Sequence, residues 1–152
     1  MDFELTRSSH ALGESNLHLQ FTPAYRRAVF ARPRVQRLVK AYFLAKADDL
    51  RVSVLAFEFG PDHLHLFISD WKDYAVSDLV RLLKGFVSFM MRKNHWKLFK
   101  DLLWGNKFWS NGYFYRTVGS VTGETIKFYI ERSQKKHWVN QKTLSDFLTP
   151  LN

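Results

Sequence analysis

The first regular pattern in the chain is a strict alternation of apolar and polar residues between Ser15 and Thr22. Successive side chains of a strand point to opposite faces, so this alternation predicts a half-buried β-strand, which Pro23 ends. From Pro33, a residue suited to the first turn of a helix, apolar residues recur at spacings of three and four up to Asp49. This second pattern predicts a basic amphipathic helix.

Two further strands are predicted to form a hairpin in the middle of the chain. Alternating apolar residues indicate one strand from Val52 to the Gly60–Asp62 segment, and a second strand runs from Leu64 to Ile68. Glycine, proline and aspartate are typical turn residues, so the Gly60–Asp62 segment is expected to connect the two strands.

A longer helix is predicted to begin at Ser77, a good N-cap residue, and to reach about Arg92. Gly85 in its middle disfavours the helix by about 1 kcal/mol relative to alanine, which indicates close packing against the sheet. The apolar residues at helical spacing would form its buried face: Leu79, Val80, Leu83, Val87 and Met90.

The rest of the chain adds a strand from Tyr113 to Val118 and a helix from Thr122 to about His137. The order of elements predicts an α+β fold, a ferredoxin-like sandwich with an antiparallel sheet of about four strands, helices on one face and a C-terminal helix. With 152 residues, we expect an N-terminal arm over 1–14, one domain over 15–138 and a C-terminal tail over 139–152.

His63 and His65 stand one residue apart at the start of the third predicted strand. Their imidazoles would project side by side from one face of that strand, where two nitrogens can bind one metal ion. The alternative, and the commoner role of such a pair, is two hydrogen-bonded or half-exposed histidines without a metal.

Positive charge is concentrated in two segments that contain no acidic residue. Seven lysines and arginines lie between Thr22 and Ala47 and six between Arg81 and Lys100, in a chain of formal net charge +9. Such segments in an aromatic-rich domain are typical of a phosphate-binding surface. A solvated basic surface, or one that binds an acidic protein or a membrane surface, would carry the same charge.

Particular side chains are candidates for contacts with nucleic acid. Arg26 and Arg27 follow Tyr25 in the turn after the first strand, where they could contact a phosphate backbone or be solvated. Four residues repeat along one side of the second predicted helix: Arg81, Lys84, Ser88 and Arg92. Three tryptophans could stack on bases or belong to the core, and at least one is expected in the core: Trp96, Trp104 and Trp109.

Some function classes are excluded by composition. The chain contains no cysteine, which excludes disulfides, thiolate zinc sites and cysteine nucleophiles. No apolar run is long enough to span a bilayer, and the first four residues, Met1 to Glu4, are not typical of an export signal. The sequence therefore predicts a soluble, cytoplasmic protein that does not associate with membranes.

Several of these segments together resemble the single-tyrosine HUH transposases, insertion-sequence enzymes that move single-stranded DNA. The similarity runs from about Asn16 to Gln134. Its motifs occur in the family's order and spacing: Asn16-Leu17-His18-Leu19, Tyr25-Arg26-Arg27, Pro61-Asp62-His63-Leu64-His65-Leu66-Phe67, Lys84-Gly85, Leu103-Trp104-Gly105, Gly112-Tyr113-Phe114, Thr117-Val118-Gly119 and Tyr129-Ile130-Glu131.

The resemblance implies a reaction. The hydroxyl of Tyr129 would attack a phosphodiester of single-stranded hairpin DNA, leaving a 5′-phosphotyrosine and a free 3′-OH. His63 and His65 would bind Mg²⁺ or Mn²⁺ beside the scissile phosphate. From the residues alone, an aromatic at position 129 of an amphipathic helix is usually core, and Tyr113 and Tyr115 are competing candidates in a predicted strand.

The third metal ligand of the family departs from its usual position in this chain. In the family it is a glutamine four residues after the tyrosine, but here that position is Ser133 and the glutamine is Gln134. Five residues along a regular helix place a side chain about 140° from Tyr129, so the two would not face one metal. A one-residue π-bulge that restores Gln134 is favoured, while Ser133, water or His137 remain open as the ligand.

The resemblance also implies a homodimer whose active sites are shared between subunits, because Gly119 and Gly123 would let the tyrosine helix dock on either subunit. The alternative from another functional class is a domesticated or non-catalytic protein that binds nucleic-acid hairpins. The presence of His63, His65 and Tyr129 together favours the enzyme.

Overall fold

The computed structural model describes residues 6–8, 11–13 and 15–119. Its main unit is an antiparallel sheet with the strand order β4-β5-β3-β6. The strands of this sheet are β3 (Asn16–Phe21), β4 (Ser53–Gly60), β5 (His63–Ser69) and β6 (Phe114–Val118). The predicted helix from Thr122 to His137 and the predicted tail over 139–152 lie outside the described residues.

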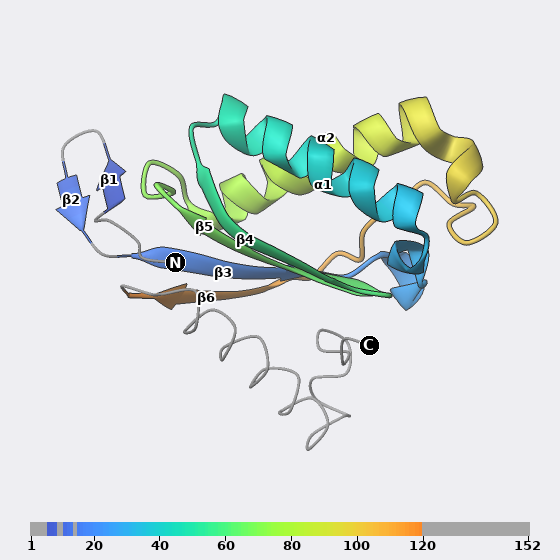
Figure 1. The fold of residues 1–152 in the computed structure, drawn as a ribbon, viewed down its shortest axis with the longest axis horizontal. Helices are drawn as coiled ribbons and strands as arrows, with labels where there is room; N and C mark the ends of the chain where they lie inside the picture. Colours follow the sequence, from blue (N-terminus) through green and yellow to red (C-terminus); the bar gives the residue numbers. More distant parts are fainter. Residues whose placement is uncertain (1–5, 9–10, 14, 120–152) are drawn as a thin grey trace, which may run out of the picture.

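Two helices cover one side of this sheet (Figure 1). They are α1 (Pro33–Asp49), which follows β3, and α2 (Val76–His95), which follows β5. The predicted α+β fold, with a four-stranded antiparallel sheet and these helices on one face, is therefore confirmed. The connection from β3 to α1 contains two 3₁₀ turns, η1 (Ala24–Arg26) and η2 (Val29–Ala31), and η3 (Trp96–Leu98) follows α2.

The N-terminal arm contains a small two-stranded ribbon. Strands β1 (Thr6–Ser8) and β2 (Ala11–Gly13) pair antiparallel, with Thr6 opposite Gly13. This pairing joins residues close in sequence and was not visible as a periodic pattern, because each strand has only three residues.

The core lies between the sheet and the two helices. Alternate residues of β3 and β5 face the helices and are buried: Leu17, Leu19, Phe21, Leu64, Leu66 and Ile68. Helix α1 contributes Val35, Val39 and Phe43 to the same cluster. The apolar alternation of the sequence thus identified the correct face of each strand.

The polar face of β3 is also buried, which corrects the prediction of a half-buried strand. His18 and Gln20 on this face are fully buried. The strand lies between β5 and β6, and aromatic rings from both neighbours contact His18. Phe67 stacks on its ring at 4.5 Å between centroids and Phe114 meets it edge-on at 5.6 Å. Rings from both neighbouring strands therefore enclose His18.

Three details of α2 differ from the prediction. The helix begins at Val76 with Ala75 as its N-cap, because the amide of Leu79 already donates to the carbonyl of Ala75, so Ser77 is not the N-cap. Met91 is buried instead of Met90, because it continues the four-residue spacing of the buried face. Gly85 is exposed and a Cβ there would meet nothing within 4 Å, so it does not pack against the sheet.

The three tryptophans considered for base stacking have different surroundings. Trp109 is buried in the core beside Phe21, Phe43 and Phe108. Trp96 is partly buried against the core, whereas Trp104 is exposed. Within the described ranges, none of the helices combines the length and the apolar character that a membrane crossing requires.

Candidate metal centre and its surroundings

His63 and His65 lie side by side at the start of β5, on the face of the sheet that α1 and α2 do not cover. Both are buried, with exposed fractions of 1% and 0%, and their ring centroids are 5.2 Å apart at an interplanar angle of 84°. The prediction that they share one strand face therefore holds. They are neither half-exposed nor part of the apolar core between sheet and helices.

Asp62 fixes the orientation of His63. Nδ1 of His63 lies 3.1 Å from Oδ1 of Asp62. Because an ionised carboxylate only accepts hydrogen bonds, Nδ1 carries a proton and donates it, and in the neutral tautomer with that proton Nε2 has a lone pair. Carboxylates play this role behind metal-binding histidines. Within the described part of the chain, Nε2 of His63 is buried without a hydrogen-bond partner.

His18 fixes the orientation of His65 from the neighbouring strand β3. Nε2 of His18 lies 2.9 Å from Nδ1 of His65. When Nδ1 of His65 donates this hydrogen bond, its Nε2 keeps a lone pair, and that atom too is buried with no partner among the described residues. The two candidate ligand atoms are thus the Nε2 atoms of both rings.

Burial favours the neutral form of His65 and of His18. Burial, with His18 and His63 as further causes, holds the pKa of His65 well below its usual value. Burial and the nearby Arg116 lower the pKa of His18 to about 3. A metal is bound by the neutral form of histidine, so the burial that disfavours the protonated ring leaves His65 ready to act as a ligand.

Gly60 provides the space that the ring of His63 occupies. Gly60 on β4 pairs with His63 on β5, and a Cβ added at Gly60 would lie 2.1 Å from Cε1 of His63. Any other residue at position 60 would therefore displace this ring. A glycine in a strand is unfavourable for the backbone, and its place here is explained by close approach of the imidazole.

Gln20 lies on β3 directly opposite His65 and is fully buried. Neither atom of its side-chain amide has a hydrogen-bond partner within the described residues. Directly opposite side chains on neighbouring strands are close enough to contact, about 4.5–5.5 Å between Cβ atoms. An amide oxygen without a partner among the described residues, opposite His65, is a suitable third donor for Mg²⁺ or Mn²⁺.

The residues present therefore fit a divalent metal. Two imidazoles have fixed outer nitrogens, and the amide of Gln20, without a partner among the described residues, lies opposite His65. In residues 6–8, 11–13 and 15–119, no group of three His, Cys, Asp or Glu side chains is assembled for a metal, so further donors must be of other types or come from elsewhere. Tyr129, Gln134, Ser133 and His137 lie outside the described residues.

The sequence patterns assigned His18, Gln20 and Asp62 to secondary-structure elements, but they predicted no role for these residues at the metal site. His18 and Gln20 were assigned to the polar side of the first strand, and Asp62 to a turn. Only the antiparallel register of β3 on β5 brings His18 and Gln20 to His65. The signal that could have found them is the presence of polar residues on a central strand next to the histidine strand.

The predicted DNA-contacting side chains have different partners. Arg26 pairs with Asp62 at 3.1 Å, and the guanidinium of Arg27 lies 5.0 Å from the ring centroid of Trp104. Arg81 is exposed near Asp78, at 3.6 Å. Arg26 therefore links the turn after β3 to the carboxylate that orients His63.

Lys84 and Arg92 are less exposed than side chains that only face solvent. Nζ of Lys84 donates to the carbonyls of Ser110 and Gly112, at 2.8 and 3.3 Å, and burial lowers its pKa to about 8. Arg92 lies over the rings of Trp96 and Phe99. Arg81 and Lys84 also line a groove of about 450 Å³ between α2 and residues 106–113. Their assignment to DNA binding stays a prediction.

Comparison with known proteins identifies the family. A profile of the IS200-like transposases matches residues 11–133, which is most of the chain. The chain belongs to the IS200-like transposase family. This finding agrees with the resemblance found in the sequence motifs, and it places the paired histidines of β5 within a member of this family.

A curated protein and a solved structure, both from Deinococcus radiodurans, are similar to this chain. The curated ISDra2 transposase TnpA is 35% identical over 85 residues, which are 56% of this chain and 60% of that protein. The aligned part thus spans about three fifths of the relative. A solved structure assigned as a transposase, from strain R1, superposes with a TM-score of 0.65 and 25% identity, covering 84% of this chain and 97% of that one.

A more distant structure has the same fold. It is a REP-associated tyrosine transposase bound to a REP hairpin, with a TM-score of 0.51 and 12% identity, covering 87% of this chain and 74% of that one. At this identity the similarity concerns the fold alone.

Proposed function

We propose that this protein binds hairpins in single-stranded DNA and cleaves and rejoins the strand through a 5′-phosphotyrosine on Tyr129, with a divalent metal. The observation that carries the proposal is the pair His63 and His65, buried side by side with both Nδ1 atoms engaged and both Nε2 atoms without a partner among the described residues. A protein that only binds DNA has no need of two prepared metal ligands next to unpaired polar groups.

The metal would be Mg²⁺ or Mn²⁺, held by His63, His65 and a third donor. When bound, such an ion acts as a Lewis acid that polarises the scissile phosphate. His18 and Asp62 engage Nδ1 of the two imidazoles and leave each Nε2 available as a ligand, so the rings need no change of tautomer before binding. Gln134, predicted from the family resemblance, and Gln20, beside His65, are the candidates for the third donor.

Tyr129 supplies the nucleophile in this proposal. Its phenolic oxygen forms a bond to phosphorus and loses its proton, while the bond from phosphorus to the 3′ oxygen of the preceding nucleotide breaks and that oxygen takes up a proton. One phosphodiester is exchanged for another, so the bond energy is kept and a 3′-OH can reverse the step on a different strand. No nucleotide cofactor is required.

Hairpin DNA is proposed as the substrate from the basic residues and the relatives. Arg26, Arg27, Arg81, Lys84 and Arg92 are the candidate phosphate contacts. The REP-associated relative is bound to a hairpin, and a similar ligand would suit the basic segments of this chain. Arg26 is next to the centre through its pair with Asp62, so it can guide a phosphate toward the histidines.

The experiment is a search for a covalent adduct. The protein is incubated with single-stranded hairpin DNA and Mn²⁺, then denatured and separated by size. We expect an adduct and a free 3′-OH product with the parent chain, and neither with Tyr129→Phe, which should bind the hairpin within a few-fold of the parent. His63→Ala and His65→Ala should remove metal-dependent cleavage. Cleavage by Tyr129→Phe at the parental rate would refute the tyrosine assignment.

We further propose that the protein forms a homodimer whose active sites are shared between the subunits. If the tyrosine helix of one subunit serves the histidines of its partner, a mixture of His63→Ala and Tyr129→Phe proteins regains one working site in each heterodimer. Heterodimers that form but do not cleave would indicate sites built within one chain. Hairpin binding without any adduct in the parent would favour the domesticated or non-catalytic alternative.

A further inference from the structure

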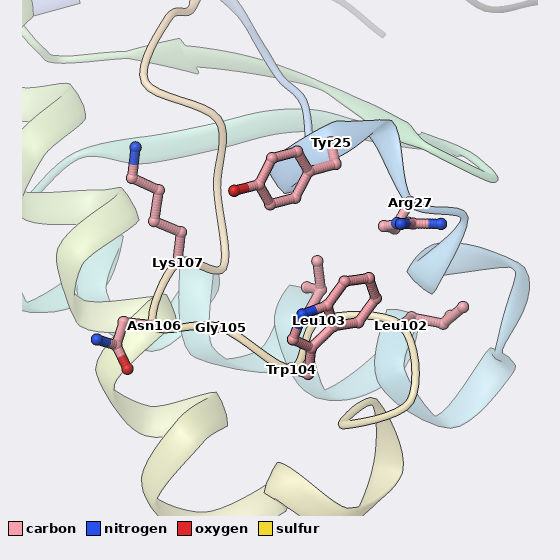
Figure 2. Close-up of a pocket in the computed structure, with 8 residues that line it drawn as sticks. All are labelled: Tyr25, Arg27, Leu102, Leu103, Trp104, Gly105, Asn106 and Lys107. Atoms are coloured by element: carbon pink, nitrogen blue, oxygen red, sulfur yellow. The ribbon is translucent and has the colours of Figure 1, made fainter.

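A cavity of about 560 Å³ opens between the turn after β3 and the loop that follows α2 (Figure 2). Leu102 and Leu103 are among the residues that line it. The side chains that define its sides are Tyr25, Arg27, Trp104 and Lys107. The turn and the loop are far apart in sequence, so only the folded chain makes this space.

Two aromatic side chains face this cavity and are unusually exposed. Tyr25 is 80% exposed and Trp104 is 64% exposed, although large aromatic side chains are normally buried for most of their area. Figure 2 shows the Tyr25 ring on one side of the space and the Trp104 indole on the other. An apolar surface kept open between two rings is suited to a flat aromatic ligand.

The backbone holds Tyr25 outward in an unfavourable conformation. Tyr25 and Arg26 have φ values of 55° and 53°, in the left-handed region that disfavours residues with a Cβ. The turn is held by the Arg26 amide, which donates to Pro23, and by the pair of Arg26 with Asp62. A strained turn that holds a tyrosine in solvent indicates that the exposed ring has a use.

The charges around the cavity favour an anionic ligand. Arg27 and Lys107 lie at opposite ends of it in Figure 2, and none of the described side chains that line it is acidic. The guanidinium of Arg27 lies 5.0 Å from the Trp104 ring centroid, so the cation and the aromatic surface are adjacent. An aromatic group attached to a phosphate matches this combination.

The cavity is also connected to the candidate metal centre. Tyr25 precedes Arg26, which pairs with Asp62, and Asp62 accepts the hydrogen bond of His63. The turn that carries Tyr25 is thus tied, through Arg26 and Asp62, to the ring of His63. This arrangement favours a ligand that belongs to the processed strand over an unrelated small molecule.

We propose that this cavity binds an unpaired nucleobase of the single strand that crosses the metal centre, with the base between Tyr25 and Trp104 and the adjoining phosphate near Arg27 and Lys107. This inference rests on the proposed function, since it takes single-stranded DNA as the substrate. Stacking on aromatic side chains tolerates every base, so the cavity would grip the strand without reading its sequence.

The test compares binding of fluorescein-labelled oligothymidylate with that of a matched oligomer of abasic sugar phosphates, by fluorescence anisotropy with EDTA present so that no cleavage occurs. The parent should prefer the oligomer with bases by about 10-fold, the size typical of one stacked base. Trp104→Ala and Tyr25→Ala should lose this preference while binding the abasic oligomer like the parent. Trp104→Phe should keep most of it.

The matched control is Phe89→Ala. Phe89 on α2 is 61% exposed and has Lys93 over its ring, so it reproduces an exposed aromatic beside a cation outside the cavity. It should leave the preference unchanged. Arg27→Gln and Lys107→Gln should weaken binding of both oligomers. Each substitution should also reduce the slope of log affinity against log salt concentration by about one.

If the parent, Trp104→Ala and Tyr25→Ala proteins all prefer the oligomer with bases equally, the cavity does not bind a base, whatever the outcome of the adduct experiment. An equal loss in Phe89→Ala would also refute base binding in the cavity, because the effect would then be general to surface aromatics. Conversely, the parent could form no phosphotyrosine while its preference for bases depends on Trp104. That result would refute the proposed reaction and support base binding in the cavity. Melting temperatures check that the exposed substitutions leave the fold intact.

Discussion

Nε2 of His18 on β3 lies 2.9 Å from Nδ1 of His65 on β5. This contact makes His18 a positioning residue for the candidate metal ligand. Replacing His18 by Leu removes the acceptor for Nδ1 of His65, and we expect the affinity for Mn²⁺ to fall about 10-fold, as for other groups that orient a ligand. Titration of free Mn²⁺ by electron paramagnetic resonance measures this change.

The conservative variant His18→Gln separates orientation from packing. Its side-chain oxygen can accept the same hydrogen bond, so most of the Mn²⁺ affinity should return, whereas a purely structural role would leave both variants equally affected. Parental Mn²⁺ affinity in His18→Leu would show that His65 needs no partner.

Gly60→Ala should displace the ring of His63. Its Cβ would lie 2.1 Å from Cε1 of that ring, far inside contact distance, so the imidazole must rotate away from the position that Asp62 holds. We expect Mn²⁺ affinity to fall about 10-fold or more, as for a disturbed metal ligand. Calorimetric titration with Mn²⁺ provides the measurement.

Gly85→Ala is the matched control for this substitution. A Cβ at Gly85 meets nothing within 4 Å, and alanine is favoured over glycine inside a helix by about 1 kcal/mol. This variant should raise the melting temperature slightly and leave Mn²⁺ affinity unchanged. If both alanines behaved alike, the space at Gly60 would have no special relation to His63.

Gln134→Ala should weaken Mn²⁺-dependent cleavage about 10-fold or more, while Ser133→Ala should have little effect, because a π-bulge would turn Gln134 toward the metal. Cleavage rates at limiting Mn²⁺ test the ranking. The reverse ranking would refute the π-bulge and indicate that Ser133, His137 or water completes the site.

Gln20→Leu tests the amide beside His65. Leu has a similar volume and removes an amide that is buried without partners among the described residues, so the metal-free variant should melt at a higher temperature than the parent. If the amide is a metal donor, Mn²⁺ should raise the melting temperature of Gln20→Leu less than that of the parent. An equal rise in both would exclude Gln20 as a donor.

Lys84 gives a pH dependence with a definite sign. Burial lowers its pKa from 10.5 to about 8, so between these values the unfolded chain binds the proton that the folded chain has lost. The contribution of Lys84 to stability is therefore fully present above pH 10.5, and it is lost as the pH falls through about 8. The melting temperature of the parent should rise relative to that of Lys84→Met between pH 8 and pH 10.5.

The same pair of proteins tests the predicted DNA contact of Lys84. A bound phosphate favours the charged ammonium, so parental DNA affinity should decrease above pH 8 more steeply than that of Lys84→Met. Parallel pH profiles would assign Lys84 to holding the loop at Ser110 and Gly112 instead.

Local patterns in the sequence determined the order and type of the main elements. Alternation in β3 and helical spacing in α1 and α2 depend on residues within one element, and burial of their apolar faces follows directly. The two-residue spacing of His63 and His65 likewise fixed their common face, because strand geometry leaves no other arrangement.

Tertiary structure decided which groups surround these histidines. The register of β3 on β5 brings His18 and Gln20 to His65, and the pairing of β4 with β5 places Gly60 under His63. The cavity between Tyr25 and Trp104 needs a turn and a loop that are distant in sequence. Such relations are set by how elements pack across the whole domain, and one residue's shift in register would change every partner.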